Sequence, residues 1–304
     1  MGWSMSQLLS TEAVARAYVA PRAIVRARRG LVRGIGWIAF YAVLLAGSVV
    51  MVMPLVWMLS TASKPIWETE APELRLIPSQ FLLFENLQAA FRRIDLGRYF
   101  LNSTIVAVAR TAGHLLLCSL AGYSFAKYTY RGRDMLFMAV LSTLMIPFFV
   151  VLIPLFVVVR NLGWLNTYYA LIVPGLVSPF GIFLMRQFIM GIPSELIDAA
   201  RIDGASEPGI FVRIILPLTT PALSALAILT FLASWDDYVY PLTVISRKDL
   251  YTVPLGLAWF SSQYLTIWNE LMAAALVAML PVFIVFLLFQ RYFVQGVVLS
   301  GLKG

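Results

Sequence analysis

Six apolar segments, each long enough to cross a bilayer as a helix, dominate this sequence of 304 residues. The hydrocarbon core of a membrane is about 30 Å thick, so a helix needs about 20 residues to cross it. The segments are residues 36–59, 99–122, 135–159, 165–188, 214–235 and 271–290. Because unpaired backbone groups are costly in lipid, each segment should be helical. The sequence therefore predicts an all-α integral membrane protein with six transmembrane helices.

The composition agrees with a membrane protein. Hydrophobic residues make up 61% of the chain and charged residues 12%, whereas a soluble domain has about 25% charged residues. The net charge of +8 does not indicate nucleic-acid binding, because the basic residues are spread over short loops between apolar segments. The single cysteine, Cys118, excludes an internal disulfide, and with only one histidine we expect no metal site.

The basic residues also predict the orientation of the chain. Residues 1–33 hold six arginines and one acid, Glu12, and the apolar run that follows is too long for a signal-peptide core. We expect a retained anchor with a cytoplasmic N-terminus, because Lys and Arg favour the cytoplasmic side. Alternation of six spans then places fourteen Lys or Arg inside and eight outside. The predicted parts are a cytoplasmic arm (1–33), a transmembrane domain (34–295) and a cytoplasmic tail (296–304).

Prolines are frequent inside the predicted spans. They are Pro147, Pro154, Pro174, Pro179, Pro217, Pro221 and Pro281. Each removes a backbone donor and disfavours straight helix in the preceding turn. A single one is ordinary in a membrane helix, but seven together favour bent helices around a cavity, as in a transporter.

Motifs for enzymatic chemistry are missing from the sequence. It has no phosphate-binding GxxxxGK[ST] loop, so we expect no nucleotide hydrolysis by this chain, and it has neither HExxH nor GxSxG. We therefore predict no catalytic residues and a role other than that of an enzyme.

Arg110 and His114 are candidate residues of a substrate pathway. They lie four residues apart in the second span, hence on one helix face. Ionisable side chains at bilayer depth usually point to a bundle interior or a wet cavity. The alternative is a structural pairing of Arg110 with a neighbouring subunit or with helix carbonyls.

An aromatic and acidic cluster at the predicted outer end of the fifth span is a second candidate. It consists of Trp235, Asp236, Asp237, Tyr238 and Tyr240. Aromatic faces can stack on sugar rings and carboxylates can accept hydroxyl hydrogen bonds. A belt of interfacial aromatic residues would explain Trp235 and the tyrosines, but not two adjacent acids. We therefore assign Trp235, Asp236, Tyr238 and Tyr240 to the pathway as expectations.

A charged segment rich in small residues, 193–213, separates the fourth and fifth spans. Its small side chains favour close docking against another protein, although a plain surface turn is the alternative. Ser194 can cap a helix over 195–203, and Gly204 suits a left-handed helix end. Ser206 can then start a second helix that runs into the fifth span.

This segment resembles the EAA loop of the membrane subunits of bacterial ABC importers. The matching residues are Asp198-Ala199-Ala200, Gly204-Ala205, Phe211, Ile214 and Leu216-Pro217. The sequence departs from the family pattern at Asp198, where the usual residue is Glu. The resemblance implies that an ATPase subunit contacts the following residues: Glu195, Asp198, Ala199, Ala200, Arg201, Asp203, Gly204 and Ala205.

Further segments narrow the resemblance to maltose-type carbohydrate importers. AGYSFAK at 121–127 and SWDDYVYPL at 234–242 are similar to that group, and the ending QRYFVQGVVLSGLKG is similar to the second of its two membrane subunits. The resemblance implies the fold of a type I importer permease in the bacterial cytoplasmic membrane, and a tail that reaches between the ATPase subunits.

The implied partners are a second permease, two ATPase subunits, an extracytoplasmic solute-binding protein and membrane lipid, without nucleic acid. ATP and Mg would bind to the ATPase subunits, so this chain needs no cofactor of its own. The expected substrate is a sugar or oligosaccharide. Glycerol phosphate or a related polyol phosphate is the alternative, since Arg110 would suit an anion. A secondary transporter that works without ATP is a third possibility.

Overall fold

The computed structural model describes residues 36–73, 75–261 and 266–301, with side chains as far as residue 288. The predicted arm therefore lies outside the described residues. Contacts divide the chain into two units, Met1–Met58 and Leu59–Gly304, which we describe separately. The described residues form helices and no strand, apart from an isolated bridge between Ser261 and Thr266. The all-α prediction is confirmed.

Three helices are long and apolar enough to cross a membrane unbroken. They are Gly36–Ala62, α4 (Leu96–Lys127) and α15 (Trp268–Gly301), the last meeting the criteria over Trp268–Leu288. These confirm the first, second and sixth predicted spans. The backbone of α15 continues as helix to Gly301, so the predicted tail from residue 296 begins inside this helix.

Three bent pairs of helices are also long and apolar enough, taken together, for each pair to form one broken span. Together with the unbroken helices they give up to six spans. The pairs are α5 (Arg133–Ser142) and its 3-10 turn (Thr143–Met145) with α6 (Phe148–Asn161), bent by 106°; α7 (Tyr168–Ile172) and its 3-10 turn (Val173–Gly175) with α8 (Pro179–Met190), bent by 42°; and Glu207–Leu218 with α12 (Thr220–Trp235), bent by 80°.

The predicted segments 135–159, 165–188 and 214–235 are each broken into two helices, as the prolines within them favoured. Prolines account for the breaks. Ile146 has extended backbone dihedrals before Pro147, as residues before proline prefer, and α6 starts only after this proline. Pro179 and Pro221 occupy the first turns of α8 and α12, where a missing N–H costs nothing.

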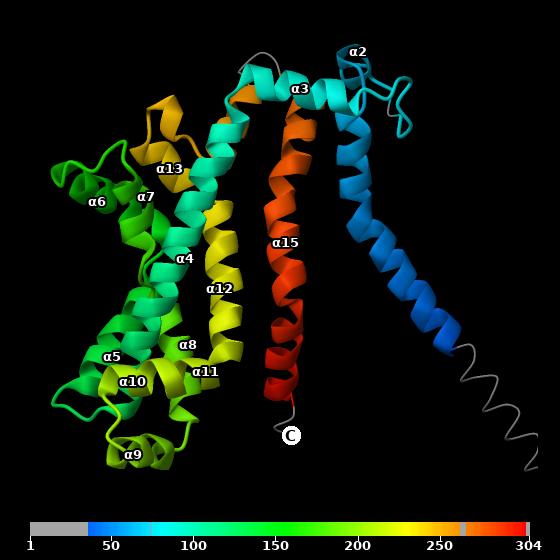
Figure 1. The fold of residues 1–304 in the computed structure, drawn as a ribbon. Coiled ribbons are helices and arrows are strands. Elements are labelled where there is room, and N and C mark those ends of the chain that lie inside the picture. Colours follow the sequence, from blue (N-terminus) through cyan, green and yellow to red (C-terminus); the bar gives the residue numbers. More distant parts are fainter. Residues whose placement is uncertain (1–35, 74, 262–265, 302–304) are drawn as a thin grey trace, which may run out of the picture. The chain divides into compact units, whose positions relative to one another are not determined.

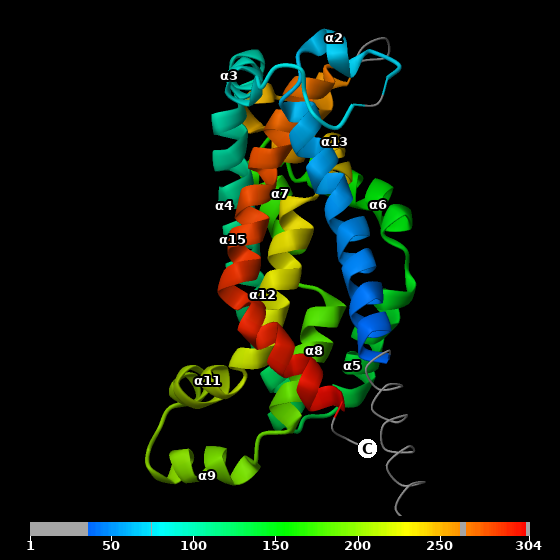
Figure 2. The same ribbon diagram turned by 90° about the vertical axis from the view of Figure 1, so that its right-hand side faces the viewer.

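Helix α4 is the centre of the unit from Leu59 onward. It packs along α8 and α12, and α12 packs on α15, as Figures 1 and 2 show from two directions. At the α4–α8 crossing, a Cβ on Gly122 would lie 2.7 Å from the Cβ of Met185. A glycine is therefore required for the two backbones to approach this closely.

The short helices gather at the two ends of these long helices (Figures 1 and 2). One end carries α9 (Ser194–Ile202), α10 (Glu207–Ile210), a π-helical turn (Phe211–Ile215) and α11 (Leu216–Leu218). The other carries α2 (Ile66–Thr69), α3 (Leu83–Arg93), α13 (Val239–Val244), a 3-10 turn (Lys248–Leu250), α14 (Val253–Leu257) and a second 3-10 turn (Ala258–Phe260). We call these the α9 end and the α3 end.

A buried asparagine holds the α3 end together. Asn102 of α4 is 2% exposed. Its Nδ2 donates to the carbonyl oxygens of Asp249 and Tyr251, both at 2.9 Å, and its Oδ1 accepts from the Tyr168 hydroxyl at 2.6 Å. A buried polar group that is fully paired fixes local geometry, so this side chain pins the loop after α13 to α4.

Candidate functional site

The segment 193–213 forms two helices joined by a tight turn, as predicted. Helix α9 ends at Ile202, and Gly204 has a φ of 80°, the left-handed conformation expected there. The Ser206 hydroxyl caps α10 by accepting from the Gly209 N–H at 3.3 Å. Two details differ. Pro193, not Ser194, occupies the N-cap position of α9, and the second helix does not run into the fifth span, because the chain bends by 80° before α12.

Ile197 is the one buried residue of helix α9, and Ser194, Ala200 and Arg201 add further contacts to the rest of the protein. Ile197 is 2% exposed and belongs to the same apolar cluster as Ile189 of α8 and Ile210 of α10. Elsewhere the helix is open: Ile202 is 87% exposed. The predicted docking residues are also exposed except Ala200, which is half-buried: Glu195, Asp198, Ala199, Arg201, Asp203, Gly204 and Ala205. The structure thus presents them on a small, largely uncovered surface.

An ion pair across the Gly204 turn connects the two helices. Arg201 Nε lies 2.7 Å from Glu207 Oε1, and Arg201 Nη1 lies 3.2 Å from Asp198 Oδ1. The neighbouring Glu207 carboxylate raises the pKa of Arg201 above its usual range. Among the residues predicted to contact a partner, Arg201 is therefore already engaged within the chain, together with Asp198.

Two tyrosines at the end of α4 extend this ion pair. Glu207 Oε2 accepts hydrogen bonds from the hydroxyls of Tyr128 at 2.5 Å and Tyr123 at 3.3 Å. We call Arg201, Glu207, Tyr123 and Tyr128 the clamp. Sequence reasoning missed it, although opposite charges six residues apart around a turn glycine were a usable signal. The clamp attaches the α9–α10 turn to the end of the central helix.

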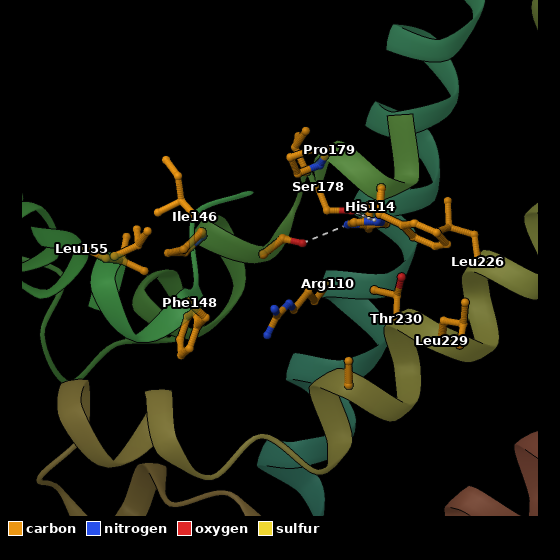
Figure 3. A pocket seen from close by; sticks show the side chains of 16 residues that line it. Arg110, His114, Ile146, Phe148, Leu155, Ser178, Pro179, Leu226, Leu229 and Thr230 are labelled. Carbon is orange, nitrogen blue, oxygen red and sulfur yellow. Dashed lines mark hydrogen bonds between the residues drawn. The ribbon is translucent and has the colours of Figure 1, made fainter. Parts of the chain in front are cut away.

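Arg110 and His114 line the same cavity, as their spacing predicted. This cavity of about 630 Å³ lies among α4, α6, α8 and α12. Figure 3 shows the Arg110 guanidinium extending into it toward Phe148, while Leu226, Leu229 and Thr230 of α12 form the opposite side. Most of the other side chains around it are apolar, including Ile146, Leu155 and Pro179.

Arg110 and His114 both have partners within the chain. Arg110 Nη1 lies 3.3 Å from Asp237 Oδ2, and a Cβ on Gly175 would lie 1.8 Å from Arg110 Nε. Glycine at 175 leaves space for Arg110 in this conformation. His114 Nδ1 is 3.1 Å from the Gly175 carbonyl oxygen, and its Nε2 is 3.2 Å from Ser178 Oγ.

Arg110 and His114 thus lie against residues 175–178, which connect α7 to α8, and both also line the cavity. Of the two adjacent acids in the sequence, Asp237 is the one that reaches this site. Sequence reasoning assigned the pathway role to its neighbour Asp236.

The structure does not bring the four predicted aromatic and acidic residues to this cavity. Trp235 is 2% exposed, and its Nε1 donates to the Ala278 carbonyl at 3.1 Å. The buried Tyr240 hydroxyl donates to the Ala170 carbonyl at 3.0 Å. Asp236, with Trp235, lines a separate cavity of about 430 Å³ among α12, α14 and α15, and Tyr238 is partly exposed at the surface.

Comparison with known proteins places the chain in a family. Residues 118–299 match the model of the "binding-protein-dependent transport system inner membrane component". The chain is 38% identical over 274 residues to the arabinooligosaccharides transport system permease protein AraQ of Halalkalibacterium halodurans, which covers 89% of this chain and 95% of AraQ. It is 34% identical over 266 residues to the sn-glycerol-3-phosphate transport system permease protein UgpE of Pectobacterium atrosepticum, covering 85% and 94%.

A solved structure supports the same fold. A chain of a bacterial ABC transporter involved in the import of the acidic polysaccharide alginate superposes with a TM-score of 0.77 at 19% identity, over 85% of this chain and 96% of that chain. This likeness supports the fold of a type I ABC importer permease. The family model and the relatives, which match along most of their length, lead to one conclusion: the chain belongs to the family of binding-protein-dependent transport system inner membrane components.

Proposed function

We propose that this chain is a permease subunit of an ATP-driven importer in the bacterial cytoplasmic membrane. It translocates a sugar or oligosaccharide that an extracytoplasmic binding protein delivers. The observation that carries this proposal is the 38% identity to an arabinooligosaccharide permease along nearly the whole chain. The exposed α9 with its turn glycine supports it, because an open helix of small residues suits docking to a partner.

The coupling role falls to the segment 193–213. Helix α9 docks into a cleft on an ATPase subunit, and the small side chains of Ala199, Ala200 and Ala205 permit close approach. Glu195 and Asp203 can form charge-assisted hydrogen bonds with basic groups of that subunit. Asp198 already pairs with Arg201 at 3.2 Å. A basic group of the ATPase subunit would therefore share the Asp198 carboxylate with Arg201. ATP and Mg bind in the ATPase subunits.

The cavity at Arg110 is the proposed share of this chain in the translocation pathway, with the second permease supplying the rest. Asp237 offsets the charge of Arg110, so the cavity carries no free positive charge at that position. A neutral sugar can use the Arg110 guanidinium as a hydrogen-bond donor. Glycerol phosphate, the alternative that the UgpE relative supports, would have to compete with Asp237 for the guanidinium.

Reconstitution of the complete transporter tests this function. The complex of both permeases and two ATPase subunits is placed in vesicles and given its binding protein loaded with an arabinooligosaccharide or with glycerol 3-phosphate. We expect the oligosaccharide to stimulate ATP hydrolysis and to enter the vesicles. Stimulation by the phosphate ester alone would favour the alternative substrate. Uptake driven by an ion gradient without ATPase subunits would contradict the proposal.

The proposed orientation places the α9 end and both termini in the cytoplasm. Cysteine substituted at the exposed Ser206 should react with an impermeant maleimide only from the cytoplasmic side. The single native cysteine, Cys118, is buried and serves as the blank. Labelling from the outside of intact cells would reverse the orientation.

A further inference from the structure

Helix α3 has three distinct faces. Successive residues turn by about 100° around a helix, so Asn86, Ala90 and Arg93 share the face that packs on α15, where Asn86 and Ala90 are buried. A second face carries the apolar side chains of Phe84, Leu87 and Phe91. Phe84 is 80% exposed and Phe91 is 43% exposed. The third face is polar, with Glu85, Gln88 and Arg92.

Contacts on the packed face fix how α3 is rotated about its axis. Arg93 donates two hydrogen bonds to Glu270 of α15: Arg93 Nε to Glu270 Oε2 at 2.6 Å, and Arg93 Nη2 to Glu270 Oε1 at 2.8 Å. Asn86 Nδ2 donates to the Ala62 carbonyl at 2.8 Å, and Asn86 Oδ1 accepts from Asn269 Nδ2 at 2.9 Å. Rotating α3 to bury Phe84 would break the hydrogen bonds of Asn86 and Arg93. These bonds therefore keep the two phenylalanines facing outward.

The position of α3 along the spans sets its depth in the membrane. Two residues, Ile94 and Asp95, connect it to α4, which has 32 residues and is therefore about 48 Å long. A bilayer is about 30 Å thick in its hydrocarbon core and about 40–45 Å with its headgroups. Helix α3 thus lies at the level of the headgroups, across the ends of α4 and α15 in Figure 1 and viewed along its axis in Figure 2.

We propose that α3 is an interfacial helix whose Phe84–Leu87–Phe91 face inserts into the outer leaflet of the membrane. A helix with an apolar stripe beside a polar face, lying parallel to the bilayer, binds at the boundary of headgroups and acyl chains. The exposed Arg92 at its C-terminal end adds attraction to lipid phosphate. Helix α4, which follows α3, also exposes apolar side chains in its first three turns, Leu101 and Ile105. The choice of leaflet rests on the proposed function.

A site-directed probe tests this placement. Cysteine is introduced at Phe84 or at Phe91. Gln88, on the polar face of the same helix, is the matched control position. Each cysteine variant is labelled with the fluorophore NBD. The assembled transporter is reconstituted without nucleotide into vesicles of phosphatidylethanolamine and phosphatidylglycerol, with or without lipids that carry a shallow doxyl quencher. Wild-type protein gives the blank, since Cys118 is fully buried.

The lipid proposal expects blue-shifted emission and strong doxyl quenching at positions 84 and 91, and quenching by an aqueous ion at position 88. Aqueous quenching at all three positions would overturn it. Shielding of positions 84 and 91 from both quenchers would also overturn the proposal and would assign the face to another protein subunit. Shielding that appears only when the binding protein is added would overturn it as well. None of these readings depends on transport or substrate, so a wrong proposal about the sugar leaves this result intact.

Discussion

The two ends of the unit from Leu59 onward hold their surface helices in different ways. At the α3 end, two buried polar side chains are paired: Asn102 is 2% exposed and Glu270 is 7% exposed. At the α9 end, Arg201 and Glu207 meet with side chains that are 41% and 44% exposed. An exposed ion pair contributes about 0–1 kcal/mol, whereas a partly buried pair costs more to break. The α3 end is therefore a fixed platform, and the α9 end is a joint whose contacts can be exchanged.

The largest effect should come from the turn of the joint. Gly204→Asp should abolish transport while membrane insertion stays normal, because it puts a charged side chain on the docking surface, at a position with φ 80° that glycine adopts without strain. Open space surrounds this position, so a clash cannot be the cause. Gly204→Ala, which adds strain of about 1–2 kcal/mol, is the graded control. Uptake assays on the vesicle-reconstituted complex measure both, and normal uptake by the aspartate variant would refute the docking role.

Breaking the platform should lower stability rather than coupling. Arg93→Ala leaves the nearly buried Glu270 carboxylate without its two hydrogen bonds, a loss of about 1–3 kcal/mol. We expect a lower Tm in detergent and unchanged ATP use per transported molecule. Adding Glu270→Gln to this variant should restore part of the Tm, because it removes the orphaned charge. An uncoupled ATPase with an unchanged Tm would contradict the division between platform and joint.

Loosening the clamp should do the reverse. Glu207→Gln weakens the contacts with Arg201 and Tyr128, so we expect several-fold less stimulation of ATP hydrolysis by the loaded binding protein and a Tm close to that of the wild type. Tyr128→Phe removes the 2.5 Å bond and Tyr123→Phe the 3.3 Å bond. The first should therefore impair coupling more than the second. Equal, wild-type stimulation in all three variants would remove the clamp from the coupling path.

The smallest effect is expected at an exposed ion pair of the α3 end. Arg247 holds the pKa of Asp249 below its usual range through hydrogen bonds as short as 2.6 Å. The stability from this pair is present above the ordinary pKa of Asp and is lost as the pH falls through the lowered value. Because the Arg247 side chain is largely exposed, Arg247→Gln should leave the Tm unchanged at neutral pH. A clear drop would mean that exposed pairs contribute to the platform after all.

Local sequence signals predicted much of the joint correctly. Gly204 and Ser206 act through the dihedral angle or the hydroxyl of one residue and a partner nearby in the chain, so the helix–turn–helix followed from the sequence. The presence of bends also followed, from the prolines. The angle of each bend did not, because it depends on packing between helices. The 80° turn at Thr219 thus separated α11 from the fifth span, where the sequence predicted continuity.

Contacts between distant residues were beyond the sequence. Arg110 and Asp237 are 127 positions apart, and nothing in the pattern distinguishes Asp237 from Asp236. Trp235 has the composition of a sugar-stacking residue, yet its ring stacks on Phe231 with centroids 5.8 Å apart. Aromatic side chains serve cores and binding sites equally well, so only the fold separates the two uses.

The bare crossing at Gly122 has a mechanical consequence. A Cβ at this position would lie 2.7 Å from the Met185 Cβ, so no side chain of Gly122 separates α4 from α8 here, and the two helices should move together. The clamp contacts α4 on the α9 side of this crossing, close to Gly122. The longer part of α4, from Gly122 back to Leu96, extends to the platform at the α3 end. A displacement of α9 can therefore pass along α4 toward Arg110, and any residue bulkier than glycine at 122 would push the two helices apart.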